Sequence, residues 1–307
     1  MKKIIFVGIL SLVLVVFLSG CLLNFQTKQK TNDKLKVAVT IFPIYDIVRE
    51  IAGDKIEVSL VLPPGASPHT FEVSTSQIKN LQGIKTLFVV GQGLDNWSQN
   101  IISSVPDSQI FDLSKTITLK PFDIQDSNHT PDPDEEGSGQ YDPHYWLDPT
   151  NAISVAKVVS KQLAVLSPEN EVYFNQRAED FINNLLARDI VWKEKLSGLE
   201  NNKLVVFHDA WGYFADYYGL DIVASFEPFP GQEPTPQYLK ELQIAVKDYN
   251  IKTLFAEPQL SQDSIKTFAR DLGVDIKVLD PNGGVEGRNS YIEMMEFNVE
   301  NVYELLK

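Results

Sequence analysis

Short runs of β-branched and other apolar residues alternate with amphipathic stretches over most of the chain. In the first half, runs with the length of buried strands lie at 35–41, 56–62 and 86–90, with a helical pattern at 44–52. In the second half, such runs lie at 204–208, 222–226, 253–256 and 276–280, with helical patterns at 209–219, 236–250 and 261–272. Because strands that alternate with helices build parallel sheets, the pattern predicts two α/β lobes.

One helical pattern is long enough to join two lobes. It starts at Ser167 and Pro168, which suit the N-cap and the first helical position, and continues to about Leu196 without glycine or a further proline. Its apolar positions are Val172, Phe174, Ala178, Phe181, Leu185 and Ile190. A helix of about 28 residues spans roughly 40 Å. We therefore expect a rigid linker helix at 167–197 between an N-terminal lobe, 35–166, and a C-terminal lobe, 198–307.

The N-terminus has the pattern of an export signal. Lys2 and Lys3 precede an apolar run at 4–18, which is followed by Ser19, Gly20 and Cys21. The run is shorter than the roughly 20 residues of a transmembrane helix. Its end resembles the bacterial lipobox, which implies cleavage before Cys21 and lipidation of this thiol. We expect a lipoprotein signal peptide at 1–20, a polar tether at 21–34 and a lipid anchor on the extracytoplasmic face of the cell membrane.

Net charge and composition limit the classes of partner that the chain is expected to bind. The formal net charge of −14 argues against nucleic acid, because an acidic surface repels a phosphate backbone. Acidity also concentrates cations weakly, although it serves solubility equally well. The segment 123–140 is rich in acidic residues, proline and glycine and predicts a surface loop. Its single histidine, His129, could gather cations loosely. The chain has one cysteine, Cys21, so neither an intrachain disulfide nor a cysteine metal cluster is expected.

Three histidines stand at the edges of predicted elements. His69 and His144 follow prolines in loops, and His208 ends an apolar run. In α/β folds ligands collect where strands end, and neutral imidazole is a common ligand of transition metals. Calcium or magnesium would call for oxygen donors instead. The three histidines therefore indicate a site for zinc or a related metal, and their wide spacing means that the fold must bring them together.

Two acidic residues are candidates for a fourth donor. Asp280, in the segment VLDPNGG, would complete a set of three imidazoles and one carboxylate, although an aspartate before Pro-Asn-Gly is commonly a turn former. Glu257, in FAEPQ, is a rival donor or a partner that supports a ligand. Glu257 could also be the general base of a surface zinc hydrolase. Against this reading, four protein ligands would leave no coordination position on the metal for a reactive water, and the chain has no HExxH motif.

Five segments in order carry a resemblance to a known family: GASPHTFE, DPHYWLDP, FHDAWGYFADYYGL, FAEPQ and LDPNGG. They resemble the signature blocks of the metal-specific solute-binding lipoproteins of ABC importers for zinc and manganese. The resemblance extends over 35–307. It implies two α/β lobes joined by one rigid helix, with a metal held in the cleft by His69, His144, His208 and Asp280.

The same resemblance implies what the protein does. Zinc-type members have a histidine at the third ligand position, where manganese-type members have a glutamate, so His208 favours Zn²⁺ over Mn²⁺. We expect a monomeric binding protein, not an enzyme, that delivers zinc to an ABC permease. The alternatives are a manganese- or iron-type binding protein of this family, a surface zinc hydrolase, or an adhesin.

Overall fold

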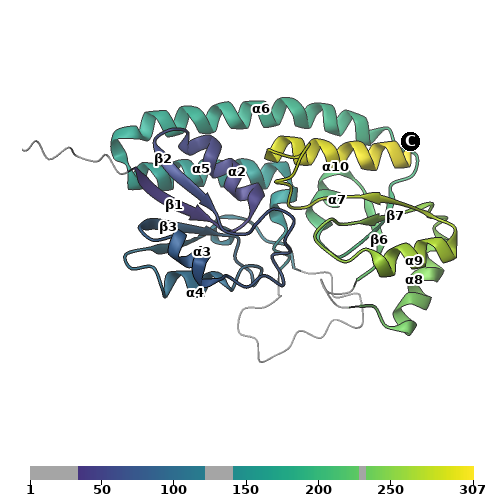
Figure 1. Cartoon of the computed structure of the whole chain (residues 1–307). Helices are drawn as coiled ribbons and strands as arrows, with labels where there is room; N and C mark the ends of the chain where they lie inside the picture. The colour runs from purple at the N-terminus through teal and green to yellow at the C-terminus, as the bar shows by residue number, and fades with distance from the viewer. Residues whose placement is uncertain (1–33, 122–140, 228–232) are drawn as a thin grey trace, which may run out of the picture. The chain divides into compact units, whose positions relative to one another are not determined.

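Four parallel strands form the first sheet in the computed structural model, which describes residues 34–121, 141–227 and 233–307. Their order is β2-β1-β3-β4 (Figure 1). The strands are β1 (Leu35–Val39), β2 (Ile56–Leu60), β3 (Ile84–Val89) and β4 (Gln109–Asp112). The central strand β1 ends in three residues with no solvent exposure, Val37, Ala38 and Val39. A strand buried on both faces is typical of a parallel sheet, which explains why this run reads as continuously apolar.

Four helices among the described residues accompany this sheet in the first half of the chain. They are α2 (Phe42–Ala52), α3 (Thr75–Asn80), α4 (Ser98–Ile102) and α5 (Pro149–Leu166), with single 3₁₀ turns η1 (Leu113–Thr116) and η2 (Tyr145–Leu147). Helix α5 was not predicted from the sequence. It begins at Pro149, and the side chain of Asp148 accepts a hydrogen bond from the backbone N–H of Thr150 as the N-cap.

The second half repeats the alternation of strands and helices. It contains β5 (Lys203–Val206), α7 (Gly212–Tyr218), β6 (Asp221–Ser225), α8 (Pro236–Asp248), β7 (Thr253–Ala256), α9 (Asp263–Leu272), β8 (Asp275–Val278) and α10 (Tyr291–Leu306). Strand β5 pairs with β6 and β7 pairs with β8, both in parallel, and β5 also contacts β7. The predicted strands of this half are all present, whereas α10 was not predicted.

The long helix α6 (Glu171–Ser197) contacts elements of both halves (Figure 1). Its first turn differs from the prediction, because Pro168–Asn170 form a 3₁₀ turn and the Ser167 hydroxyl donates to Glu169 instead of capping a backbone N–H. The predicted apolar face was also wrong at two positions. Val172 and Ile190 are exposed, while Asp189, Trp192 and Leu196 are buried.

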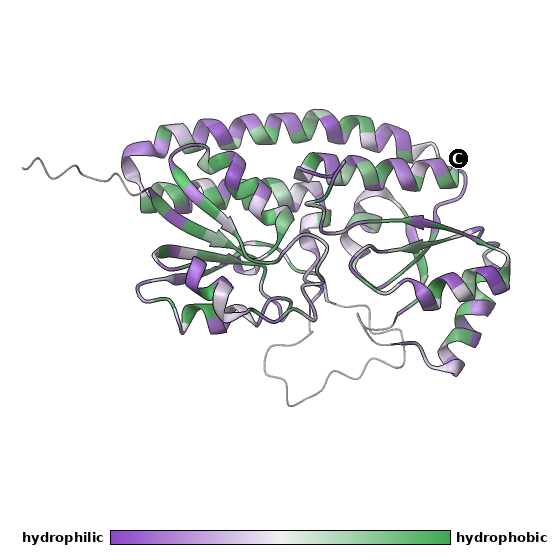
Figure 2. Cartoon of the chain, in the orientation of Figure 1, coloured by the Kyte–Doolittle hydropathy of each residue, from purple (hydrophilic) through white to green (hydrophobic). Residues whose placement is uncertain are grey.

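The largest apolar core crosses the two halves through α6. It joins Val37 and Ile47 to Leu185, Trp211 and Val299, which lie in different parts of the chain. A second core, around Val205, Phe207 and Leu254, lies within the second half. Figure 2 shows the strands largely apolar and α6 with alternating polar and apolar positions. The predicted α/β class with one long helix is confirmed. Residues Leu35–Lys307 form one compact unit, so the predicted lobe boundaries stay a prediction.

Two adjacent leucines of α6 provide a matched test of this packing. Leu185 is fully buried in the shared core, whereas Leu186 is 44% exposed. Leu185→Ala should lower the free energy of unfolding by about 2–5 kcal/mol, because it leaves a cavity. Leu186→Ala should change it by less than about 0.5 kcal/mol. Denaturant unfolding of both variants measures the difference, and equal losses would show that α6 does not pack as described.

No helix among the described residues has both the length and the apolar character that crossing a bilayer requires. The predicted signal peptide, Cys21 and the acidic loop with His129 lie outside the described residues.

Candidate metal centre

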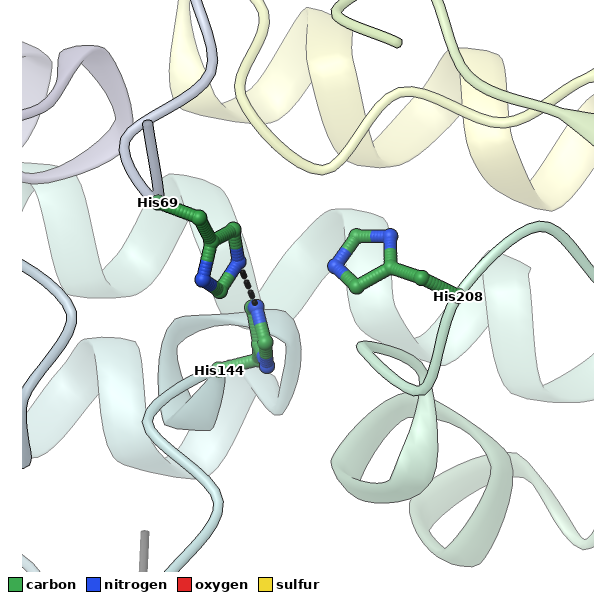
Figure 3. A group of neighbouring side chains, drawn as sticks. All are labelled: His69, His144 and His208. Carbon is green, nitrogen blue, oxygen red and sulfur yellow. Dashed lines mark hydrogen bonds between the residues drawn. The ribbon is translucent and has the colours of Figure 1, made fainter. Parts of the chain in front are cut away.

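The fold brings together the three histidines that the sequence singled out. His69 lies in the loop after β2, His144 directly precedes the 3₁₀ turn Tyr145–Leu147, and His208 follows β5 by two residues. One ring nitrogen from each lies within 4.8 Å of the others. Figure 3 shows the three rings turned toward one another, with His208 approaching from the opposite side to His69. Histidines distant in sequence therefore share one site.

The spacing of the rings suits a single small metal ion. Nε2 of His69 and Nε2 of His144 are 3.3 Å apart, and the three ring centroids are 5.3–5.4 Å from one another. Two nitrogens bound to tetrahedral zinc at about 2.0–2.1 Å would be about 3.3–3.4 Å apart. Nε2 of His208 is buried and has no hydrogen-bond partner among the described residues. The donor set and its spacing fit zinc.

The histidines line a small cavity. Its volume is about 10 Å³, and its walls are Ser67, Pro68, His69, His144, His208, Glu257, Gln259, Leu260, Pro281 and Asn282. This space is about that of one water-sized occupant. A larger cavity of about 630 Å³, between α7, β6 and α8, contains none of the three histidines. The smaller cavity is the candidate metal centre, because the imidazole nitrogens converge there.

The electrostatic surroundings keep two of the rings neutral. Burial, with the neighbouring His144 and His208 rings, lowers the pKa of His69 well below its usual value. Burial likewise lowers the pKa of His144. Because the neutral imidazole is the form that binds metal, both rings are ready to act as ligands at neutral pH.

A buried carboxylate orients the His144 ring. Oδ1 of Asp142 lies 2.7 Å from Nδ1 of His144 and accepts a hydrogen bond from the His144 backbone N–H at 2.9 Å. Burial raises the pKa of Asp142 to about 7. A carboxylate on Nδ1 leaves Nε2 for the metal, an arrangement that is common around metal-bound histidines. Asp142 was not among the residues predicted from the sequence, although it stands two residues before His144.

Glu257 lies beside the His208 ring as Asp142 lies beside the His144 ring. Its Oε2 lies 2.8 Å from Nδ1 of His208, and its Oε1 accepts a hydrogen bond from Nε1 of Trp211 at 3.0 Å. Burial lowers the pKa of His208, but the charge and contact of Glu257, together with the charges of Asp209 and Asp142, outweigh burial and raise this pKa. Glu257 directly follows β7 and is 1% exposed. Of its two predicted roles, this geometry favours support of His208 over direct binding of the metal.

Removal of the Glu257 charge should weaken metal binding. In Glu257→Gln, Nδ1 of His208 loses its anionic partner, and Nε2 becomes a poorer ligand. Changes to such supporting groups typically lower metal affinity by about 10- to 100-fold, and competition with a chromogenic chelator measures the loss. Glu241 is exposed, so Glu241→Gln is the matched control and should bind zinc with the affinity of the parent. Parent-like affinity in Glu257→Gln would contradict a supporting role.

Asp280 lies outside the group of three histidines. Its carboxylate is fully buried, and Oδ1 accepts hydrogen bonds from the backbone N–H groups of Asn282 and Gly283, both at 3.0 Å. This is the geometry of a turn former. Gly284 follows at φ +79°, a conformation that favours glycine, and a Cβ there would lie 2.9 Å from the Phe42 ring. Direct binding of metal by Asp280 stays a prediction.

A known protein family matches most of the chain. The family model described as zinc-uptake complex component A, periplasmic (ZnuA), matches residues 37–305. The zinc-binding lipoprotein AdcA of Streptococcus pneumoniae is 28% identical over 309 residues, which cover 98% of this chain and 60% of that protein. The chain thus spans about three fifths of the length of AdcA.

Two further proteins are similar over nearly their whole length. The manganese-binding lipoprotein MntA of Halalkalibacterium halodurans is 26% identical over 306 residues, which cover 98% of this chain and 97% of MntA. A crystal structure of ZnuA superposes with a TM-score of 0.79 at 26% identity, and the match covers 90% of this chain and all of that one. With the family model matching most of the sequence, the chain belongs to the ZnuA family of zinc-uptake components.

Proposed function

We propose that this chain is an extracytoplasmic binding protein that captures zinc with His69, His144 and His208 and delivers it to an ABC import permease. The observation that carries the proposal is the convergence of three buried or half-buried imidazoles on one small cavity. The permease is the partner that membership of this family implies. We further propose a monomer, anchored to the cell membrane through lipid on Cys21, since AdcA and MntA are both named lipoproteins.

The donor set supports zinc over manganese as the cargo. Manganese favours oxygen donors and higher coordination numbers, whereas zinc accepts several imidazoles in a tetrahedral site. A glutamate at position 208 would favour manganese, but the chain has His208. Copper and nickel also bind nitrogen ligands strongly, so the availability of each metal also decides which ion the protein carries.

The surroundings of the cavity argue against a zinc hydrolase. Both carboxylate oxygens of Glu257, the candidate base, are engaged by His208 and Trp211. A cavity of about 10 Å³ admits no substrate larger than water. Binding and release of an ion need neither a free base nor a substrate pocket.

Metal analysis followed by competition tests the proposal. Protein purified without added metal should contain zinc, and after its removal the protein should bind one zinc ion per chain and prefer it strongly to manganese. Titration of the metal-free protein with each ion, alone and in competition, provides the comparison. Preference for manganese would favour the alternative cargo, and absence of binding by either ion would refute the proposal.

A further inference from the structure

Strand β6 is an edge strand of the second half. Among the described residues it pairs only with β5, and the side of β6 away from β5 has no neighbouring strand. The backbone N–H and C=O groups on such a side are a template for an added strand. The strand also has three partly exposed apolar residues in a row, Ile222, Val223 and Ala224.

The larger cavity, of about 630 Å³, runs along this edge. All five residues of β6 line it, and no residue of β5 does. Because successive side chains of a strand point to opposite faces, a cavity over one face of the sheet would contact every second residue. Contact with the whole strand therefore places this cavity, which we call the β6 groove, along the edge. Its volume lies within the range of about 300–1,000 Å³ that is usual for ligand pockets.

Helices from the two faces of the sheet form the walls of the groove. Val206 of β5 belongs to the same core as Phe214 of α7, whereas Val205 belongs to the second core with Leu242 of α8. Because adjacent residues of a strand point to opposite faces, α7 and α8 lie on opposite faces of the sheet, and both contact β6 (Figure 1). An extended chain along the edge of β6 would therefore fit between two helices.

Negative charge dominates the walls of the groove. Five carboxylate residues and one lysine, Lys120, line it, whereas the whole chain has 41 acidic and 27 basic residues. Lys120 is paired with Asp216 of α7, which offsets its positive charge. Asp216 and Glu241 of α8 are both exposed, and they stand on opposite walls. Cationic side chains would be attracted to both walls.

Like charge disfavours the two occupants that this chain itself provides. The segment 123–140 is acidic and contains neither lysine nor arginine. A second copy would bring the same carboxylates of its own edge against those of the first, which costs free energy. The charge complement of the groove is therefore a basic segment of a different protein.

We propose that the β6 groove binds an extended, basic peptide segment of another protein, which adds to the sheet as a strand beside β6. In this kind of recognition main-chain hydrogen bonds, here to 221–224, supply affinity and side chains supply specificity. The strand ends at Ser225, whose carbonyl already accepts a hydrogen bond from the Tyr238 hydroxyl at 2.9 Å. Basic side chains an odd number of positions apart would point to opposite faces and reach Asp216 and Glu241. The groove contains none of the three histidines, so this inference is independent of the proposed function.

A fluorescent hexapeptide, Thr-Lys-Val-Val-Lys-Thr, tests the proposal by polarisation titration with the full chain. One peptide should bind per chain. A peptide with glutamate in place of both lysines should bind at least about tenfold more weakly, because like charges then meet. A peptide methylated on every backbone nitrogen keeps its charge but loses the N–H donors, so it should also bind at least about tenfold more weakly. Equal binding of the methylated peptide would show attraction by charge alone and would overturn the inference.

Two substitutions that remove charge test the location of the site. The double variant Asp216→Asn/Glu241→Gln should bind the lysine peptide about 3- to 10-fold more weakly, because each wall loses a carboxylate. Glu179→Gln, at an exposed position of α6 outside the groove, is the matched control and should bind the peptide like the parent. Zinc affinity and thermal denaturation of the double variant should stay close to the parent, which checks that the fold is intact. Parent-like peptide affinity of the double variant would also overturn the inference.

Deletion and sedimentation distinguish the other occupants. Pro121 and Tyr141 form an antiparallel bridge, so a short turn can replace 123–140 while the two ends stay together. The shortened chain should bind the lysine peptide with an affinity close to that of the parent. Peptide binding that occurs only after this deletion would assign the groove to that segment, and a dimer that the peptide dissociates would assign it to a second copy. Either result would overturn the inference.

Discussion

Replacing His208 by alanine should lower zinc affinity by more than about 100-fold, because one of three proposed protein ligands is lost and such a loss exceeds the usual effect of a supporting group. His69 and His144 would still offer two nitrogens 3.3 Å apart, so weak binding should remain. Calorimetric titration of the metal-free variant with zinc measures the change.

Replacing His208 by glutamate should change the choice of metal as well as the affinity. A borderline nitrogen donor becomes a hard, charged oxygen donor, which zinc tolerates and manganese favours. We expect zinc binding to weaken and the preference for zinc over manganese to shrink. His129→Ala, in the acidic segment, is the control and should match the parent. If His129→Ala loses zinc while His208→Ala keeps it, the site is in that segment.

Zinc affinity should fall on acidification toward the usual histidine pKa of about 6.5, and His208 should be the first ring to respond. The pKa of His208 is raised above its usual value, so its ring gains a proton at a higher pH than an ordinary histidine, and zinc must then displace that proton. His69 and His144, whose pKa values are lowered, stay neutral until the solution is more acidic. Competition titrations at a series of pH values measure this profile.

The same series on His208→Ala identifies the responsible ring. Without His208, the remaining zinc affinity should begin to fall only at lower pH, because the lowered pKa values of His69 and His144 then set the onset. Parent affinity that stays constant between pH 7 and about pH 5 would contradict a site built from three imidazoles.

The convergence of the three histidines could be predicted from the sequence, because each of them stands next to a structural boundary. Pro68 and Pro143 interrupt the chain before His69 and His144, and His208 follows a strongly apolar strand. Boundaries of this kind lie where loops gather at the ends of parallel strands. Most of the strands were predictable because a central strand of a parallel sheet, such as β3, is buried on both faces and forms a short, largely apolar run. The edge strand β4, no residue of which is fully buried, was not predicted.

The residues that the sequence did not reveal are recognised only by their contacts in the folded chain. Asn282 and Arg288 become notable only because the turn after β8 lies beside the cavity and beside Asp280. Asp142 occupies an ordinary turn position, and its importance follows from its contact with the His144 ring. Polar residues of this kind have no periodicity to mark them.

The helical pattern of apolar residues also predicted two wrong positions on α6, which packs against several other helices. Val172 and Ile190 fit an apolar helical face, yet they are exposed because the face of α6 that meets α2, α5 and α10 is set by Phe174, Leu185 and Trp192. Buried Asp189 replaces an apolar residue on this face, where it accepts hydrogen bonds from the hydroxyls of Tyr217 and Tyr218. A one-dimensional pattern does not show such a tertiary contact.

Anomalous diffraction from crystals of the zinc-loaded protein, recorded on both sides of the zinc absorption edge, would locate the bound zinc ion. We expect one strong zinc peak at about 2.0–2.1 Å from a ring nitrogen of each of His69, His144 and His208. A fully loaded crystal whose zinc peak lies elsewhere, or contacts fewer than three of these rings, would contradict it.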